Sequence, residues 1–272
     1  MKELHIFLNA LVFLTRIRVP SWVVFSQTNL QAAARYFPFI GFIVGALSAG
    51  VFYLSAMVFG SHLAVLLSMV FSIYLTGAFH EDGWADSCDA FGGGYHKEQI
   101  LTIMKDSRLG TYGVVGLILL LAAKYQALVQ LAQLDAMYVV IAYVLAHTIS
   151  RFWAVSLIYT HDYVQDIDKS KSKPLANSMR LKDVLLSILI SSLALGAAAA
   201  LLNAYMPSTY IPHRLLWPIG IGLLASLLAK LYLANYYKRQ IGGYTGDCLG
   251  AVQQFSEVVF YLGIILGFSV IT

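Results

Sequence analysis

Three aspartates inside an otherwise apolar chain are spaced in a way that suggests metal chemistry. Asp82, Asp86 and Asp89 lie at positions i, i+4 and i+7, so on a helix their carboxylates share one face. Like charges at such close range repel one another, and a divalent cation among them makes the arrangement favourable. A set of oxygen ligands suits a hard ion, so we expect Mg2+, or Mn2+ in its place, rather than Zn2+.

The residues that follow these aspartates are suited to binding phosphate. Gly92 and Gly93 belong to a run of three glycines, which lets the backbone come close to a ligand. Lys105 and Arg108 follow further along the chain, and both cations are available to meet a phosphate. The alternative for the whole stretch is a solvated loop in which the aspartates only cap helices.

A second glycine-rich stretch, residues 242–251, contains another acid, Asp247. Backbone amides at such a loop attract anions where a helix begins. Asp247 either completes a metal site with the earlier aspartates or only caps that helix. Arg151 lies within an apolar run, with His147 one turn earlier. A charge so deep in a span either reaches a phosphate or an acidic loop residue, or forms an ion pair inside the bundle.

Clustered acids, cations and glycine loops together fit phosphoryl transfer, in which a protein mostly positions groups and neutralises charge. The sequence has no Walker-type lysine loop, so we do not expect ATP hydrolysis. No credible Ser-His-Asp or Cys-His arrangement stands out. The residues alone therefore predict a metal-dependent membrane transferase that acts on a phosphate-bearing substrate.

The composition is that of a membrane protein. The chain has 272 residues, of which 59% are hydrophobic and only 12% are charged, whereas soluble domains average about 25% charged residues. We expect an all-α fold, in which residues 1–272 form a single domain that is a polytopic integral membrane helix bundle. About six or seven transmembrane helices are expected from the length of the apolar runs.

The expected spans alternate with polar stretches. They are Phe37–Phe59, His62–Phe79, Tyr112–Leu134, Met137–Thr160, Leu185–Ala204, Leu215–Tyr237, and a shorter seventh span from Glu257 or Val258 to Ile271. His5–Leu14 is too short to cross a bilayer, which needs about 20 residues, so we expect an interfacial or bundle-packed helix there. For Arg16, Arg18 and Arg35 we expect lipid-headgroup anchoring ahead of phosphate binding.

The distribution of Lys and Arg predicts the orientation in the membrane. Nearly all of them fall in the N-terminal segment and in three stretches, near 80–110, 161–184 and 238–257, whereas the opposite side holds only Arg214. By the positive-inside rule the rich side is cytoplasmic. The acids gather on the same side without being driven there by that rule, so we expect the active face, with its catalytic loops, at the cytoplasmic boundary.

Five segments carry a resemblance to a known family. They are His80–Gly94 (HEDGWADSCDAFGGG), Met104–Gly110 (MKDSRLG) and Gly243–Ala251 (GYTGDCLGA), together with Phe13–Arg16 and Arg35–Gly41 near the N-terminus. In this order and at these separations they resemble the cobalamin synthase family, also called the adenosylcobinamide-GDP ribazoletransferases. The similarity covers most of the chain.

The resemblance implies the last assembly step of cobalamin (vitamin B12) biosynthesis. The family joins adenosylcobinamide-GDP to alpha-ribazole, or to its 5'-phosphate, and releases GMP. Its members are Mg2+-dependent, multi-pass enzymes of the bacterial inner (cytoplasmic) membrane. The implied partners are these two substrates and membrane lipid, a homo-oligomer is compatible with the resemblance, and no nucleic acid is involved.

The resemblance also implies roles for individual residues. The Mg2+ ligands on the diphosphate would be Asp82, Asp86 and Asp89, with Asp247 as a further ligand. The leaving GMP would be neutralised by Lys105 and Arg108. The attacking ribose hydroxyl would be oriented or deprotonated by one of three residues, between which the sequence does not choose: Glu81, Asp106 or His80.

Two other functions stay open at this point. A CDP-alcohol phosphatidyltransferase-like enzyme also uses aspartates on membrane helices to handle a diphosphate, but Ala85-Asp86 stands where that pattern has Ala-Arg. A cation-coupled transporter could use Arg151, Lys124 and the acids. The gathering of acids at one membrane boundary speaks against a transport path, which needs polar groups near the midplane.

Overall fold

A computed structural model describes residues 2–164, 179–205 and 213–271 of the chain. Within these ranges the protein is a bundle of long helices, and its only β-type pairing is a single bridge between Tyr163 and Tyr244. The expectation of an all-α helix bundle is confirmed. Residues 165–178, which belong to the charged stretch expected near 161–184, lie outside the described residues.

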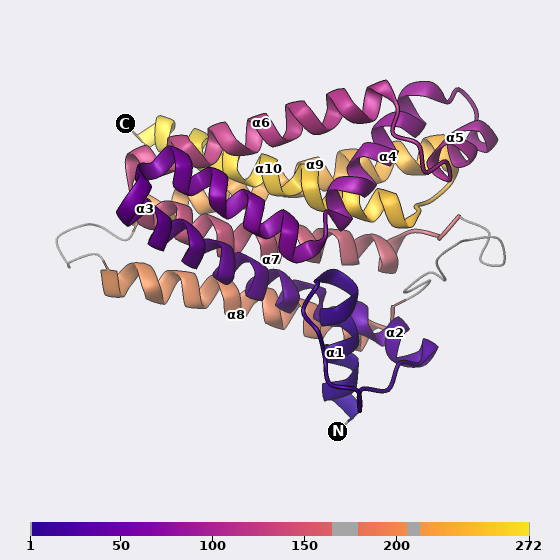
Figure 1. Ribbon diagram of the computed structural model, residues 1–272, viewed down its shortest axis with the longest axis horizontal. Coiled ribbons are helices and arrows are strands. Elements are labelled where there is room, and N and C mark those ends of the chain that lie inside the picture. The colour runs from indigo at the N-terminus through magenta and orange to yellow at the C-terminus, as the bar shows by residue number, and fades with distance from the viewer. Residues whose placement is uncertain (1, 165–178, 206–212, 272) are drawn as a thin grey trace.

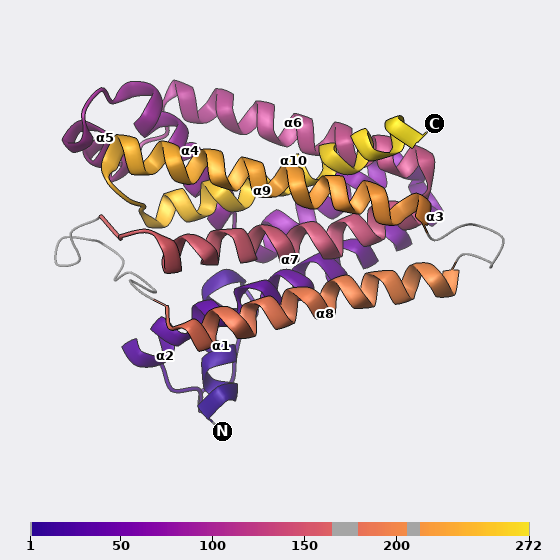
Figure 2. The same cartoon turned by 180° about the vertical axis from the view of Figure 1, so that it is seen from behind.

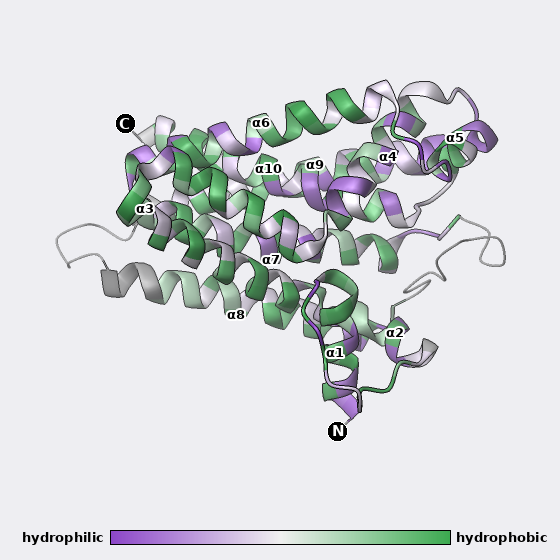
Figure 3. Cartoon of the chain, in the orientation of Figure 1, coloured by the Kyte–Doolittle hydropathy of each residue, from purple (hydrophilic) through white to green (hydrophobic). Residues whose placement is uncertain are grey.

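The helices differ greatly in length, and the long ones form the bundle (Figure 1). In chain order they are α1 (Lys2–Leu14), α2 (Gln27–Ala33), the 3-10 helix η1 (Ala34–Tyr36), α3 (Phe37–Thr76), α4 (Phe79–Gly93), α5 (Lys97–Met104), α6 (Thr111–Leu134), α7 (Ala136–Thr160), α8 (Leu181–Tyr205), α9 (His213–Ile241) and α10 (Gly246–Ile271). Six helical segments of the described chain are long and apolar enough to cross a membrane. Figure 3 shows the hydrophobic colouring along these long helices.

The longest of these segments is bent into two arms. Within α3, Gly60 has a φ of 73° and a ψ of 172°, a conformation that favours glycine. Figure 1 shows α3 folded back on itself in two arms. Both arms contact Tyr143 of α7, because Gly45 lies against its backbone carbonyl and the Ser68 hydroxyl is 2.6 Å from its phenol oxygen. The arms correspond to the first two predicted spans, the second ending at Thr76 instead of Phe79.

The last helix is longer than the sequence suggested. We expected a loop near 238–257 and a short seventh span, but α9 continues to Ile241 and α10 begins at Gly246. Gly242, with a φ of 86°, ends α9. The Thr245 hydroxyl then accepts a hydrogen bond from the backbone N–H of Cys248, which is the geometry of a helix N-cap. Asp247 therefore lies in the first turn of α10, and the capping side chain is that of Thr245.

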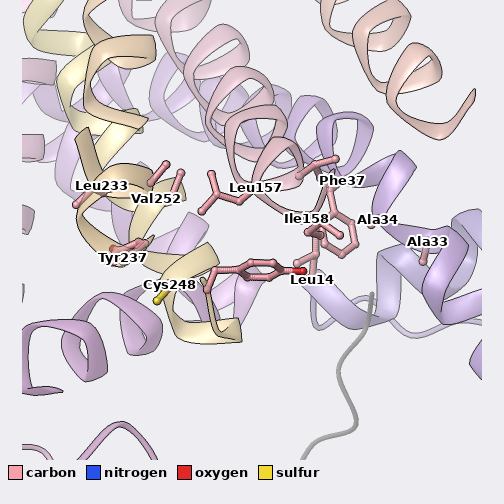
Figure 4. Close-up of a cluster of buried hydrophobic side chains, with 14 of the residues drawn as sticks. Leu14, Ala33, Ala34, Phe37, Leu157, Ile158, Leu233, Tyr237, Cys248 and Val252 are labelled. Atoms are coloured by element: carbon pink, nitrogen blue, oxygen red, sulfur yellow. The ribbon is translucent and has the colours of Figure 1, made fainter. Parts of the chain in front are cut away.

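Helix α1 runs across the long helices instead of along them (Figure 1). Its buried face includes Ile6, Ala10 and Leu14. Figure 4 shows Leu14 in one cluster with side chains from η1, α3, α7, α9 and α10, among them Phe37 and Ile158. The helix expected at His5–Leu14 is therefore present, and it packs onto the bundle through one face.

Arg35 does not have the role that we expected. Its guanidinium is buried and forms ion pairs with Glu3 of α1 and, at 2.7 Å, with Asp183 of α8. The expectation of headgroup anchoring was wrong for this residue, because two carboxylates from distant parts of the chain neutralise it inside the protein. Arg16 and Arg18, by contrast, are exposed.

Polar segments that are far apart in the sequence meet at one end of the bundle. The end of α7, the junction of α9 and α10, and helices α4 and α5 lie on the same side in Figures 1 and 2. Tyr244 N–H donates to the Asp162 carbonyl at 2.9 Å, and Val164 N–H donates to the Tyr244 carbonyl at 3.0 Å. These described polar residues therefore lie together at one end of the bundle, and its position at a membrane boundary stays a prediction.

Glycines set how closely the long helices approach. A Cβ at Gly45 of α3 would lie 2.6 Å from the Tyr143 carbonyl oxygen and 2.9 Å from the Val144 Cα. A Cβ at Gly263 of α10 would lie 2.7 Å from the Cα of Gly222 in α9. Backbones this close gain extensive van der Waals contact, which is the main attraction between helices surrounded by lipid. Small residues here therefore hold the bundle together.

This close packing predicts that replacement of glycine by alanine changes the thermal stability differently at two positions of α3. Gly45→Ala should lower the Tm of the detergent-purified protein by several degrees, because overpacking costs roughly 1–3 kcal/mol. Gly50→Ala is the matched control and should leave Tm unchanged or raise it slightly, since a Cβ there meets nothing within 4 Å and Ala favours a helix over Gly. Thermal unfolding followed by circular dichroism measures both, and equal Tm values would contradict the close contact of α3 with α7.

Candidate active site

The three aspartates of the sequence motif lie on one short helix, α4, at the polar end of the bundle. Gly77 and Ala78 both have positive φ values, 67° and 58°, and this break separates α4 from α3. Since Asp82, Asp86 and Asp89 all lie within Phe79–Gly93, the predicted helical spacing is confirmed. Asp82 is exposed, and Asp86 and Asp89 are partly buried.

Asp247 of α10 lies beside this face of α4. The two helices pack closely at Gly83, where a Cβ would be 2.9 Å from the Asp247 carbonyl oxygen and 3.2 Å from the Gly250 Cα. Burial, followed by the nearby carboxylates of Asp247, Asp82 and Asp89, raises the pKa of Asp86 to about 7. The tertiary fold therefore concentrates negative charge from α4 and α10, two regions that the sequence analysis could only suggest were neighbours.

Asp89 has a structural partner of its own. Its carboxylate accepts hydrogen bonds from the backbone N–H groups of Gly110, at 2.7 Å, and Gly113, at 2.8 Å. These N–H groups lie at the start of α6, where backbone donors have no partner within the helix. The N-cap residue, Gly110, has no side chain that could accept from them. Asp89 thus caps α6 from another helix, and its role as a metal ligand stays a prediction.

The donor set can be compared with what a magnesium ion needs. Among the described residues, no group of three or more His, Cys, Asp and Glu side chains converges closely enough to hold a metal ion unaided. Mg2+ is commonly bound through one or two carboxylates plus waters and substrate phosphates. Asp82, Asp86 and Asp247 are oxygen donors from adjacent helix faces, and their mutual repulsion favours a cation. As oxygen donors they are of the type that Mg2+ prefers, and a magnesium site at this place stays a prediction.

Gly92 and Gly93, which follow the three aspartates, lie against side chains of neighbouring segments. A Cβ at Gly92 would lie 2.6 Å from the Tyr112 ring, and one at Gly93 would lie 3.5 Å from Ile103. These glycines make room for neighbouring helices, and their approach to a ligand stays a prediction.

Lys105, at the end of α5, and Arg108 are both exposed at the same polar end. Arg108 pairs with Asp106 at 2.6 Å. This ion pair raises the pKa of Arg108, so the side chain carries its positive charge throughout the physiological range. Both cations therefore stay candidates for binding the leaving nucleotide.

Glu81 and His80 point into the protein instead of toward the exposed face. Glu81 is 7% exposed and His80 is 5% exposed. Burial raises the pKa of Glu81, and burial together with the positive charge of Arg151 holds the pKa of His80 well below its usual range. His80 is therefore a neutral imidazole at pH 7. Oε1 of Glu81 accepts a hydrogen bond from the side chain of Gln254.

Inside the bundle, a buried ionic cluster connects α6, α7 and α10. Lys124 and Glu257 form an ion pair of 2.5 Å, and neither side chain is appreciably exposed. The Arg151 guanidinium donates to the backbone carbonyl of His147 at 3.0 Å and lies 3.1 Å from its Nδ1. His147 Nδ1 is 3.5 Å from Glu257. Arg151 thus belongs to this cluster, and its contact with substrate phosphate stays a prediction.

The sequence places Gln253, Gln254 and Glu257 directly after the second glycine-rich stretch, but the sequence analysis gave them no role in the site. They lie on one face of α10, where they connect the ionic cluster with Glu81. One signal could have found them. Lys124 and Arg151 are charges within apolar spans, and such charges require buried partners. Glu257 had been assigned to a loop boundary, whereas it lies well inside α10.

Comparison with known proteins covers almost the whole chain. The sequence profile of a family described as cobalamin-5-phosphate synthase matches residues 6–265. A protein of Shewanella frigidimarina named adenosylcobinamide-GDP ribazoletransferase is 45% identical over 265 residues, which is 97% of this chain and 95% of the relative. A protein of Shewanella amazonensis with the same name is 43% identical over 268 residues, covering 98% and 97% of the two chains. No solved structure gives a significant match.

Because Asp86 and Asp89 have different surroundings, we expect replacement by Asn to change the thermal stability of the metal-free protein in a different way at each position. A carboxyl whose pKa is raised in the folded state stabilises at low pH, and this contribution is lost as pH rises through about 7. In EDTA the wild-type Tm should therefore fall between about pH 5 and pH 8, and less so in Asp86→Asn, which cannot titrate. Asp89→Asn should lower Tm at both pH values, because Asn accepts poorly from two backbone N–H groups.

Differential scanning fluorimetry in detergent measures both variants. A Tm for Asp86→Asn that follows the wild-type pH dependence would contradict the proximity of the carboxylates. An unchanged Tm for Asp89→Asn would contradict the capping of α6.

Proposed function

The chain belongs to the cobalamin-5-phosphate synthase family, and from this membership we propose that it is an adenosylcobinamide-GDP ribazoletransferase, which completes the assembly of cobalamin. The observation that carries the proposal is the 45% identity to a protein of that name over 97% of this chain. The carboxylates of Asp82, Asp86 and Asp247 form an acidic face at one end of the membrane helix bundle. This acidic face is consistent with the proposal, since the reaction takes place at a diphosphate.

The reaction that we propose forms one oxygen–phosphorus bond and breaks another. A ribose hydroxyl of alpha-ribazole, or of its 5'-phosphate, attacks the phosphorus that is attached to cobinamide. The bond from this phosphorus to the GMP part of the diphosphate breaks, and GMP leaves with the electron pair. The exposed cations Lys105 and Arg108 would neutralise the charge that develops on GMP.

We propose Mg2+ as the metal of this site. Asp82, Asp86 and Asp247 would hold it, with Asp89 a further ligand beyond its bonds to α6. When bound, the ion supplies charge neutralisation at the diphosphate oxygens. The aspartates themselves would orient the diphosphate across the α4–α10 contact, because Gly83 holds these two helices at a fixed close distance.

Three residues remain candidates for orienting or deprotonating the attacking hydroxyl. Asp106 is the weakest, because both of its carboxylate oxygens already accept hydrogen bonds from Arg108. His80 is neutral and can accept a hydrogen bond, but its lowered pKa makes it a weak proton acceptor. Glu81 is a carboxyl with one oxygen engaged by Gln254 and the other without a hydrogen-bond partner among the described residues.

We also propose a location and partners. The concentration of Lys and Arg at the polar end supports a cytoplasmic location for that end, and a bacterial inner membrane is where such an enzyme would meet both substrates and surrounding lipid. No nucleic acid is needed, and a homo-oligomer is compatible with the fold. The relatives named above favour the ribazoletransferase over a phosphatidyltransferase or a transporter.

The decisive experiment is release of GMP by the purified, detergent-solubilised protein. We expect release only when adenosylcobinamide-GDP, alpha-ribazole and Mg2+ are all present, and we expect EDTA to abolish it. Asp86→Asn should lower the rate by at least about 100-fold, because a carboxylate at the diphosphate is replaced by a neutral amide.

Two results would contradict the proposal. If correctly folded protein releases no GMP under any of these conditions, the ribazoletransferase function is wrong, and CDP-alcohol donors should be tested next. If GMP is released but Asp86→Asn keeps full activity, the function stands and the assignment of the metal ligands fails.

A further inference from the structure

A side chain just after the second glycine-rich stretch links the acidic face to the interior of the bundle. Gln254 of α10 is 3% exposed. Its side-chain NH2 group donates to Oε1 of Glu81 and to Oε1 of Gln253, each at 3.0 Å. An amide has only two such hydrogens, so both are used. Gln254 therefore holds Glu81 from one side in a defined direction.

The chain of hydrogen bonds continues from Gln253 into the ionic cluster. The NH2 group of Gln253 donates to Glu257 at 2.6 Å and to the Ser150 hydroxyl at 3.0 Å. The other oxygen of Glu257 accepts from Lys124 at 2.5 Å and from Tyr261 at 3.1 Å. These residues are all buried, so the chain has fixed supports on α6, α7 and α10.

The direction of this chain follows from donor and acceptor chemistry. A carboxylate only accepts hydrogen bonds, so the amide that meets Glu257 must present its NH2 group, and so must the amide that meets Glu81. This requirement orients both glutamines. The carbonyl of Gln253 then faces Gln254 and accepts its second hydrogen. One arrangement accounts for all of these hydrogen bonds, although Oε1 of Gln254 has no partner among the described residues, and it makes Glu81 a rigidly placed group.

The second oxygen of Glu81 has no such support. Oε2 is buried, and among the described residues it has no hydrogen-bond partner. A buried polar atom without a partner costs about 1–3 kcal/mol, and a carboxylate oxygen kept in this condition is suited to accept a hydrogen bond from a bound molecule. Glu81 also immediately precedes Asp82 on α4, so its buried side chain lies next to the acidic face.

We propose that Gln254 is a positioning residue, which holds the Glu81 carboxylate so that its free oxygen accepts a hydrogen bond from the attacking ribose hydroxyl. This inference rests on the transferase function proposed above. Glu81 touches the nucleophile, whereas Gln254 acts only through Glu81. The Lys124–Glu257 pair and Gln253 provide the rigid support on which Gln254 depends.

The test is a double-mutant cycle on the rate of GMP release. Gln254→Met keeps the length of the side chain and removes its donors, and Glu81→Gln keeps the shape of the acid and removes its charge. Rates are measured with the full-length protein at saturating adenosylcobinamide-GDP and varied alpha-ribazole, with Mg2+. Gln130→Met, on the exposed surface of α6, is the matched control and should behave as wild type.

We expect Gln254→Met to lower kcat by roughly 10- to 100-fold, the scale of a misplaced catalytic group, and to change KM for alpha-ribazole by less than about threefold. Because Gln254 acts through Glu81, adding Gln254→Met to Glu81→Gln should cause no further loss. A residue that only stabilises the fold would instead lower Tm and give additive losses.

Other outcomes would overturn the inference. They are a kcat of Gln254→Met equal to that of Gln130→Met, losses that multiply in the double variant, or an effect confined to KM. If Gln254→Met does not fold, Gln254→Asn decides in the same way, because it keeps a donor that no longer reaches Glu81. Absence of GMP release by the wild-type protein as well would instead reject the transferase function, and the role of Gln254 with it.

Discussion

The ion pair between Lys124 and Glu257 is the interaction on which the interior of this protein depends. Two full charges lie inside a bundle whose outer surface is apolar, at 2.5 Å from each other and with almost no exposure. Neither charge could remain there alone, because an unpaired buried charge is strongly unfavourable. The pair therefore requires α6 and α10 to stay in register, and the hydrogen bonds of Gln253 and Tyr261 extend the same requirement.

The acidic face depends on a different constraint, which is the close approach of α4 and α10. Gly83 and Gly250 allow the two backbones to meet, and a side chain at either position would separate the helices. This contact brings Asp247 to Asp82 and Asp86, where burial and then the neighbouring carboxylates raise the pKa of Asp86. The bundle thus holds like charges together at its surface, while it pairs opposite charges in its interior.

The acidic face and the buried ionic cluster are joined by hydrogen bonds between side chains. Asp89 accepts hydrogen bonds from two backbone N–H groups of α6 while it lies near Asp86, so the spacing of three acids on one helix serves both the site and the fold. Gln254 connects Glu81 with the ionic cluster behind it. A change deep in the membrane-embedded part can therefore alter the geometry of the face at which the substrate's diphosphate would bind.

The sequence by itself determined the fold class, the positions of most membrane helices, the helical spacing of the three aspartates and the family. It could do so because apolar runs, local helical periodicity and linear motifs are properties of neighbouring residues. Only the tertiary structure decided that Arg35 is paired with Glu3 and Asp183, that Asp247 lies in the first turn of a helix, and that Asp89 caps α6. It also decided that Gln254 reaches Glu81, a residue 173 positions earlier. Such partners come from segments far apart in the chain, and no local pattern encodes which of them meet when the helices pack.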